Sequence, residues 1–487
     1  MLTIAGIVIV FIVMALLMFL RVIPALIALP LMAFFIALIG GIPLDDILVY
    51  VIGEGAFRLH QAYTITIFGG MLSIFMQKSG IAESFIRKGA ELAGDNPFYV
   101  SLIILILTSI LFTTLGGLGA IVMVGTIVLP IMSSVGISPG IIAGVFLIGL
   151  SIGGILNAQN WALYINILNV QFETVRTFAL YLFFVSLAVA IAFIIVELKR
   201  DRIIKSFKFI LNFKFLLTLA LLIAFFLIFL TLGKVERLFP DNLKNIFKLI
   251  GEILLILFLS YLFIKFIFNA ISPSHLGQLR WYALLTPIVP LVIVFALGSK
   301  YFIFAFVAGL FYGFITTFRK GSLNLLMQSI IEGGSSVIPA VALMIGIGML
   351  LNAILGPSGW GHGEWKVYAQ LKPLFKAIVP SSPVLYVAVF SLLSPLALYR
   401  GPLNVWGLGY GIATLISSPV GTLPPASVMG LLLSVGQIQG VCDPTNTHNV
   451  WIANELKIDV NQILRKTFPY MWSLATVGLI ISAMMFL

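Results

Sequence analysis

The chain repeats part of its own sequence at an offset of 278 residues. The matched positions carry the same residues in both halves: Glu54 and Glu332, Gly55 and Gly333, Ala62 and Ala340, and Gly70-Met71-Leu72 and Gly348-Met349-Leu350. Looser matches join segment 112–119 to 399–404 and segment 132–139 to 416–424. Repeated halves whose apolar segments are interrupted by Gly, Pro and Asn are typical of membrane transporters that hold their site between the halves.

Composition places the chain in the lipid bilayer. With 61% hydrophobic residues, 9% charged residues and a mean hydropathy of +1.16, it has more apolar surface than a soluble core could bury. The net charge of +11 does not indicate a nucleic-acid partner, because the basic residues lie in short loops beside apolar segments, where anionic lipid and membrane topology explain them. Cys442 is the only cysteine, so a disulfide framework and a cysteine-rich metal site are excluded.

The apolar segments predict an all-α polytopic membrane protein with about 12 transmembrane spans in two repeats. The first repeat, 1–200, is expected to hold spans at 4–20, 22–40 and 61–77, a hairpin at 97–132, a broken helix at 138–168 and a span at 175–197. A connector, 201–280, holds two spans at 215–232 and 246–268. The second repeat, 281–487, is expected to hold spans at 281–297, 300–317 and 337–355, a hairpin at 380–416, a broken helix at 424–453 and a span at 468–487.

The hairpins are predicted from the length of their second arms. A helix needs about 20 residues to cross a bilayer core, and the arms at 118–132 and 402–416 are shorter than that, so each hairpin is expected to be re-entrant. The basic connector entry at 199–208 is expected on the cytoplasmic side. The two connector spans then start the second repeat on the opposite side from the first, so the repeats are inverted. Segments 43–59 and 319–331 contain charged residues within a partly apolar pattern, as interfacial helices do.

Polar residues gather at two places in the first repeat. Between Asn96 and Phe172 no residue is charged, yet the hairpin tip and the middle of the broken helix are polar. Polar groups in apolar helices must be satisfied by one another or by a ligand, and helix ends at such breaks bind ions. A glycine-rich packing contact is the alternative. The candidate substrate-binding residues here are Thr113, Thr114, Gly116, Gly117, Asn157, Gln159 and Asn160.

The second repeat adds two charges at the corresponding places. Arg400 begins the second hairpin tip, and Asp443 opens the polar break of the second broken helix. A charge at membrane depth costs about 2.5–3.5 kcal/mol, so it is kept for a partner or a function. The planar fork of Arg400 suits a substrate carboxylate; a structural ion pair with Asp443 is the alternative. The other candidate substrate-binding residues are Gly401, Asn404, Thr445, Asn446, Thr447 and Asn449.

Asp443 is the candidate for handling a coupling cation, because a buried carboxylate can bind a proton or help to coordinate sodium. Asn446 and His448 are assigned to the same role, and a sodium site is expected near Asp443 and Asn157. The sequence leaves sodium and proton open. It also leaves open that Asp443-Pro444 only terminates a helix, since Asp-Pro is a common helix-ending dipeptide.

The two hairpins, each followed by a polar break, resemble the ion transporter superfamily, which includes citrate and gluconate permeases and divalent-anion/sodium symporters. Segments 443–458 and 463–469 are similar to the polar break and following amphipathic stretch of gluconate and citrate permeases. The resemblance implies a multi-pass secondary carrier of the cell inner (cytoplasmic) membrane, often a homodimer, that moves by an elevator mechanism. The tips 113–117 and 400–404 do not reproduce the Ser-Asn-Thr tips of the symporters.

We therefore expect a cation-coupled secondary transporter of small organic anions, carboxylates above all, without a cofactor. The alternative is a cation/proton antiporter of the same superfamily, although Arg400 would repel its substrate. An ATP-driven pump is disfavoured because no Gly-x4-Gly-Lys-Ser/Thr loop occurs. An enzyme is not expected, because four scattered histidines and one cysteine supply no metal or nucleophile constellation.

Overall fold

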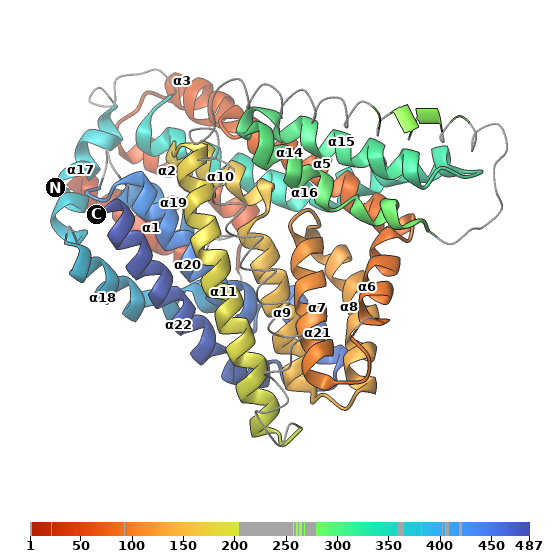
Figure 1. Ribbon diagram of the computed structural model, residues 1–487. Helices are drawn as coiled ribbons and strands as arrows, with labels where there is room; N and C mark the ends of the chain where they lie inside the picture. Colours follow the sequence, from red (N-terminus) through yellow and green to blue (C-terminus); the bar gives the residue numbers. More distant parts are fainter. Residues whose placement is uncertain are drawn as a thin grey trace, which may run out of the picture.

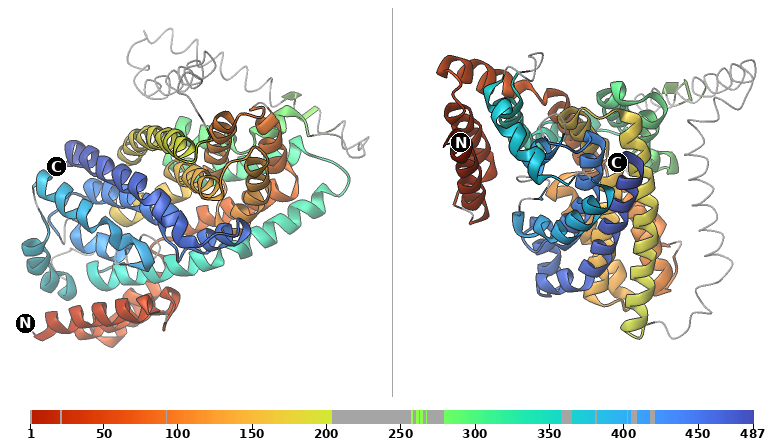
Figure 2. Two further views of the ribbon diagram at one scale, coloured as in Figure 1. Left: turned by 90° about the horizontal axis from the view of Figure 1, so that it is seen from below. Right: turned by 90° about the vertical axis from the view of Figure 1, so that its left-hand side faces the viewer.

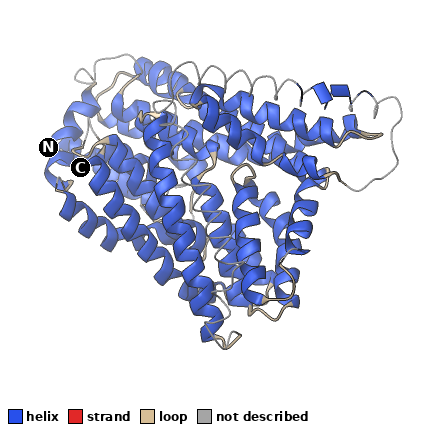
Figure 3. Cartoon of the chain, in the orientation of Figure 1, coloured by secondary structure: helices blue, strands red, loops and turns tan. Residues whose placement is uncertain are grey.

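The computed structural model describes residues 2–20, 22–91, 93–203, 279–357, 365–380, 382–401, 403–404, 409–417 and 421–487, together with isolated positions between 257 and 267. These residues form helices and connecting loops, with no β-strand among them (Figure 3). Apart from the isolated positions, the predicted connector spans lie outside the described residues. The division of the chain into two repeats and a connector stays a prediction.

The predicted all-α polytopic class is confirmed. In the part of the chain that the structure describes, the helices long and apolar enough to cross a membrane are Gly117–Ser134, Phe172–Arg200, Ser299–Thr316, Ser322–Leu355, Pro425–Glu455 and Val460–Phe486. Two bent pairs meet the same criterion when each is taken together. They are Leu44–Lys78 with Ile81–Glu91, bent by 62°, and Pro139–Ile155 with Ala158–Leu168, bent by 51°. The total of about 12 spans stays a prediction.

One group of helices, here called the scaffold block, runs along the top of Figure 1. Its long helices are α1 (Leu2–Phe19), α2 (Ala25–Ile39), α5 (His60–Lys78), α14 (Ile288–Leu297), α15 (Phe302–Thr316) and α16 (Ser322–Leu355). Figure 2 shows α16 extending along the molecule; α2 packs on α16, and α1 packs on α2. Short elements complete the block: α3 (Leu44–Asp46), η1 (Ile47–Glu54), α4 (Gly55–Phe57), η3 (Trp281–Leu285), η4 (Ser299–Tyr301) and α17 (Lys366–Ile378).

The remaining helices stand more steeply in Figure 1 and form the core block. From the first half it contains α7 (Pro97–Phe112), α8 (Gly117–Ser134), α9 (Pro139–Ile155), α10 (Ala158–Leu168) and α11 (Phe172–Arg200). From the second half it contains α18 (Pro383–Leu393), η5 (Ser394–Arg400), α19 (Tyr410–Ile416), α20 (Pro425–Cys442), α21 (Thr447–Glu455) and α22 (Val460–Phe486). The helix α6 (Ile81–Glu91) connects the blocks and packs on α7 and α8.

Glycines of the repeated motif allow α16 to approach the first half closely. A Cβ atom on Gly70 would lie 2.5 Å from the carbonyl oxygen of Gly333, and one on Gly55 would lie 2.7 Å from Cα of Met349. Side chains at these positions would therefore overlap the neighbouring backbone. The residues cannot be enlarged without separating the helices, so the repeat marks a close backbone contact in the scaffold.

The first predicted hairpin, 97–132, corresponds to α7, a turn and α8, and its re-entrance stays a prediction. Asn96 begins α7 by accepting a hydrogen bond from the backbone N–H of Phe98 at 2.9 Å. In the turn, the hydroxyls of Thr113 and Thr114 donate to the carbonyls of the preceding helical turn. The stated reason for the hairpin was wrong in one respect: α8 has 18 residues and is long enough to cross a membrane.

Other predicted boundaries change more. The sequence predicted an interfacial helix at 319–331 and a separate span at 337–355, but α16 is one helix of 34 residues. Pro339 lies inside it without ending it, because the packing of α16 on α5 and α2 holds both sides of the proline in line. The first predicted interfacial segment, 43–59, likewise continues toward α5 through α3, η1 and α4.

Both predicted broken helices are present. The first, 138–168, is α9 followed by α10, with the break at Leu156 and Asn157. The second, 424–453, is α20 followed by α21, with the break between Asp443 and Asn446. In the second hairpin, the first arm is α18 continued by η5, and the described part of the return arm is α19, which has seven residues.

Candidate functional site

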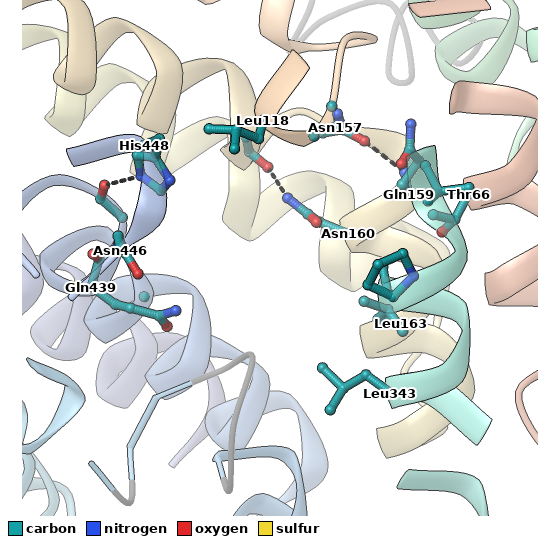
Figure 4. A pocket seen from close by; sticks show the side chains of 18 of the residues that line it. Thr66, Leu118, Asn157, Gln159, Asn160, Leu163, Leu343, Gln439, Asn446 and His448 are labelled. Atoms are coloured by element: carbon teal, nitrogen blue, oxygen red, sulfur yellow. Dashed lines mark hydrogen bonds between the residues drawn. The ribbon is translucent and has the colours of Figure 1, made fainter. Parts of the chain in front are cut away.

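A cavity of about 800 Å³ lies between the scaffold block and the core block. Its scaffold wall comes from α2, α5 and α16, including Thr66, Pro339 and Leu343. Its core wall comes from the first hairpin tip and from the breaks of both broken helices. Figure 4 shows the side chains of Asn157, Gln159, Asn160, Gln439, Asn446 and His448 around this space.

Three helices begin at the cavity wall. The first turns of α8, α10 and α21 all contribute lining residues: Gly116, Gly117 and Leu118; Asn157, Gln159 and Asn160; Asn446, Thr447 and His448. The first N–H groups of a helix have no partner within the helix, and its dipole places partial positive charge there. No side chain caps the start of α8 or of α21. The cavity is therefore lined by backbone donors that suit an anion.

The break in the first broken helix joins α9 and α10 to the hairpin tip. The Asn157 side chain donates through Nδ2 to the carbonyls of Phe112 and Leu115, at 3.1 and 3.4 Å, and its Oδ1 accepts from the N–H of Gln159 at 2.9 Å. Asn160 donates to the carbonyl of Gly154 at 2.8 Å. These bonds satisfy exposed carbonyls of the tip and of the end of α9, so the break has a defined geometry without a ligand.

Gln159 lies where the two blocks meet. A Cβ atom on Gly69, in the scaffold helix α5, would overlap the Gln159 amide, and one on Gly116 at the hairpin tip would lie 3.7 Å from Gln159 Oε1. Gln159 Nε2 is buried and has no hydrogen-bond partner in the structure. A buried donor without a partner costs about 1–3 kcal/mol, and this one lies in a residue that lines the cavity.

In the second broken helix, side chains after the break satisfy the carbonyls before it. Asn446 Nδ2 donates to the Gln439 carbonyl at 2.6 Å, and His448 Nε2 lies 3.1 Å from the Gly440 carbonyl. Asn449 Nδ2 donates to the carbonyls of Val441 and Asp443, at 3.0 and 2.9 Å. The run of polar residues that the sequence shows therefore holds α20 and α21 together across the gap.

Asp443 is fully buried and does not line the cavity. Its Oδ1 accepts from the backbone N–H and the hydroxyl of Thr445, at 2.9 and 2.8 Å. Its Oδ2 has no hydrogen-bond partner, and neither has Asn449 Oδ1. The break thus presents one face to the cavity, through Asn446 and His448, and keeps a carboxyl group behind that face.

The predicted site residues fall into two groups. Those that line the cavity are Gly116, Gly117, Asn157, Gln159, Asn160, Asn404, Asn446, Thr447 and His448. Those that do not are Thr113, Thr114, Gly401, Asp443, Thr445 and Asn449. The side chain of Arg400 lies outside the described residues; its backbone ends η5, four residues before Asn404. The proposed pairing of Arg400 with Asp443 therefore stays a prediction.

Sequence reasoning missed several polar residues of the cavity. Gln437 lies in α20 and accepts from the hydroxyl of Ser151, in α9, at 2.5 Å, which ties the two broken helices together. The rings of Tyr164 and Tyr410 lie 6.1 Å apart at the wall. The sequence could have indicated Gln437, because two glutamines interrupt the apolar run of α20. The sequence could not have indicated the tyrosine pair, because the two tyrosines come from different halves of the chain.

The described cavity wall carries no Lys, Arg, Asp or Glu. Among the residues that the structure describes, no group of three or more His, Cys, Asp or Glu side chains could hold a metal ion. Charge on a bound molecule would therefore be met at this wall by helix N-termini, amides and hydroxyls. Donors of this kind bind an anion without a fixed countercharge.

No protein-family model matches the chain, and no curated protein sequence matches it. Among solved structures, the chain is similar to the Alcanivorax borkumensis YdaH transporter, with 14% identity, a TM-score of 0.46, and coverage of 88% of this chain and 86% of that chain. It is similar to Neisseria gonorrhoeae MtrF, from a class of antimetabolite efflux pumps, with 14% identity, a TM-score of 0.46, and coverage of 88% and 84%. Likeness at this level leaves the function to be argued from the chain's own residues.

Proposed function

We propose that the protein is a cation-coupled secondary transporter of small organic anions, carboxylates above all, in the cell inner membrane. The observation that carries this proposal is the convergence of the first turns of α8, α10 and α21 on one cavity between two helical blocks. Its volume, about 800 Å³, falls in the range of about 300–1,000 Å³ in which small molecules bind. No enzymatic step is part of this function.

The substrate's negative charge would lie against the amide ends of the three helices. The start of α8 is open because Gly116 brings no capping side chain, and Gly117 has a positive φ of 83° that turns the chain into the helix. The unpartnered Gln159 Nε2 supplies a further donor. Arg400 completes the site in this proposal by giving a carboxylate a bidentate partner.

Movement would occur between the blocks. The cavity is bounded by both, so a substrate held by the core block would pass the scaffold block if the core block moved as a unit, as in an elevator. Within the core block, the Gln437–Ser151 hydrogen bond joins the broken helices of the two halves, which suits a rigid moving body. The scaffold helices would stay fixed and provide the surface for a homodimer.

Coupling would pass through the second broken helix. Asn446 and His448 face the cavity, while Asp443 lies behind them on the same four-residue break. A ligand on the first turn of α21 and a cation at Asp443, either a proton or sodium, would then act on one short segment. The binding of one would change the geometry available to the other.

A cation/proton antiporter is the second candidate. It is favoured by the buried carboxyl of Asp443, whose Oδ2 has no partner, and by the lack of a fixed cation among the described residues of the cavity wall. The two candidates differ in what crosses the membrane. An antiporter exchanges cations without an organic substrate, whereas the anion carrier needs one.

Proteoliposome uptake tests the proposal. The purified full-length chain would be offered a panel of labelled mono-, di- and tricarboxylates under an imposed proton or sodium gradient. We expect concentrative uptake of at least one carboxylate, and its loss when the gradient is collapsed. Cation exchange without uptake of any anion would support the antiporter instead.

Arg400→Lys tests the carboxylate assignment on the substrate that this screen identifies. An ammonium cannot reproduce a bidentate fork, so we expect at least tenfold weaker binding from a folded protein. Lys457→Arg, at the loop after α21 and outside the cavity wall, is the matched control and should bind as the wild type does. Unchanged affinity of Arg400→Lys would remove this residue from the site.

A further inference from the structure

The break between α20 and α21 contains two buried oxygen atoms that face no donor. They are Oδ2 of Asp443, a residue that is 0% exposed, and Oδ1 of Asn449, which is 1% exposed. The two residues are in direct contact, because Asn449 Nδ2 donates to the backbone carbonyl of Asp443 at 2.9 Å. Two buried acceptors without a donor, in touching residues, would each carry an uncompensated desolvation cost.

Four acceptors around this pair already receive hydrogen bonds. The carbonyls of Gln439, Gly440 and Val441 accept from the side chains of Asn446, His448 and Asn449. Asp443 Oδ1 accepts twice from Thr445. Hard cations such as Ca²⁺ and Mg²⁺ are normally held by six or more oxygen ligands, whereas the buried side-chain oxygens without a partner at this break are the two of Asp443 and Asn449. A single proton needs no more than a donor oxygen and an acceptor oxygen.

We propose that Asp443 and Asn449 share one proton, which sits on Asp443 Oδ2 and is donated to Asn449 Oδ1. This inference rests on the proposed function and deepens it, because it makes the coupling ion a proton and assigns Asn449 to it. One hydrogen bond then satisfies both unpartnered atoms. Neutralising the carboxyl also removes the cost of an ionised group at a fully buried position.

Two other titratable side chains lie near Asp443. His448 and Cys442 interact electrostatically with Asp443. His448 Nε2 lies against the Gly440 carbonyl and donates a hydrogen to it, which leaves Nδ1 as the accepting nitrogen of this ring. Cys442 Sγ lies 3.2 Å from the hydroxyl of Thr467. The neighbouring helices α8 and α9 contain no Asp, Glu, His, Lys or Arg.

On α11, which packs on α20, Arg176 pairs with Glu173, Arg200 pairs with Glu197, and Lys199 is exposed; Glu455, which ends α21, is also exposed. On α22, which packs on both α20 and α21, Lys466 pairs with Glu197 and Asp201, and Arg465 is exposed. On η5, which packs on α20, Arg400 is the ionisable group whose side chain lies outside the described residues. The proton is therefore held away from the cavity wall, on a residue that does not line it.

Infrared spectroscopy of the full-length protein in lipid tests the proposal without any substrate. A protonated carboxyl gives a C=O stretching band that an ionised carboxylate lacks. We expect the wild type at neutral pH to show this band and Asp443→Asn to lose it. The amide that Asp443→Asn introduces would keep the bonds to Thr445 and Asn449, so the variant should fold. Asp201→Asn, which removes a paired carboxylate elsewhere, is the control and should keep the band.

Two further arms complete the test. Thr445→Val removes one donor to Oδ1, and we expect the band to shift and to stay present. Replacing sodium chloride by choline chloride should leave the band unchanged. Identical wild-type and Asp443→Asn spectra, or a band that sodium removes, would overturn the shared proton. Because no substrate is present, either result leaves anion transport to be judged by uptake alone.

Discussion

Gly70 touches the backbone of Gly333, and Gly333 is the residue that the 278-residue offset matches to Gly55. Gly55 in turn touches the backbone of Gly348, which the same offset matches to Gly70. Each half therefore contributes two equivalent glycines. The first glycine of each half contacts the second glycine of the other half. Such exchanged contacts are what a two-fold axis between the repeats produces. The inverted arrangement of the halves, which we predict from the charge pattern, stays a prediction, because inverted and parallel repeats are both related by such an axis.

Alanine at the central contact tests this packing. Gly333→Ala places a methyl group within 2.6 Å of the Gly70 carbonyl and against the backbone of Met71, so the helices must separate. We expect a loss of stability of about 1–3 kcal/mol, as for other overpacked interfaces. Gly334→Ala, whose new methyl would meet only the flexible end of Met71 at 4.0 Å, is the matched control. Thermal unfolding of the two variants in detergent compares them, and equal midpoints would contradict the close contact.

A double-mutant cycle tests the role of Gln159 at the junction of the blocks. Gly69→Ala should push the Gln159 amide out of its place, because the new methyl would overlap it. We expect about tenfold weaker substrate binding, about the value of one hydrogen bond. In a Gln159→Ala background, the same Gly69→Ala change should have no further effect. Additive losses in the double variant would show that Gly69 acts by another route.

The end of α11 is joined to α9 and α22 through Asp201. Burial raises the pKa of Asp201, but the hydrogen bond from Ser138 and the charge of Lys466, 3.1 Å away, outweigh it, so the pKa lies below its ordinary value. A lowered pKa contributes stability above the unfolded-state pKa of about 3.9, and that stability is lost as pH falls through the folded-state pKa.

Asp201→Asn should therefore lower stability at neutral pH by up to about 1 kcal/mol and flatten the acid side of the profile. Unfolding midpoints measured between pH 7 and pH 3 check this. Glu83→Gln, which removes an exposed i,i+4 pair with Arg87, is the control. If the stability of Asp201→Asn fell more steeply than that of the wild type as the pH is lowered, the result would contradict a lowered pKa for Asp201.

The hairpins predict which ends are reachable from the same side of the membrane. In a background where the buried Cys442 is replaced by serine, Asn96→Cys and Ser133→Cys should react with an impermeant thiol reagent from one side. Ser382→Cys, at the start of the second hairpin, should react from the other side. Labelling of Asn96→Cys and Ser133→Cys from opposite sides would show that α8 crosses the membrane, as its 18 residues allow.

The sequence predicted the elements whose signals are local. The uncharged stretch after Asn96 located the first hairpin and the break at Asn157, and the polar run after Asp443 located the second break. The direction of each side chain within a break could not be predicted. It depends on which backbone carbonyls, left without a helical partner, the side chain can donate to. Asn449, for example, is predicted to bind substrate, and in the structure its Nδ2 donates to the carbonyls of Val441 and Asp443.

Long-range contacts account for the other differences. Pro339 suggested an end or a kink, but the packing of α16 against α5 and α2 keeps it continuous. Thr66 and Tyr410 line the cavity only because distant segments meet there, and neither lies in a polar run that would mark it. Local patterns therefore identified the breaks of the core block, and tertiary packing decided what faces the cavity.

Substrate protection of a cavity cysteine tests the central claim most directly. Leu118, in the first turn of α8, is 43% exposed and lines the cavity, whereas Ser133 is exposed near the other end of the same helix. With Cys442 replaced by serine, saturating carboxylate from the uptake screen should slow thiol labelling of Leu118→Cys at least severalfold and leave Ser133→Cys unchanged. Equal labelling of Leu118→Cys with and without a transported substrate would contradict the claim that the anion binds in this cavity.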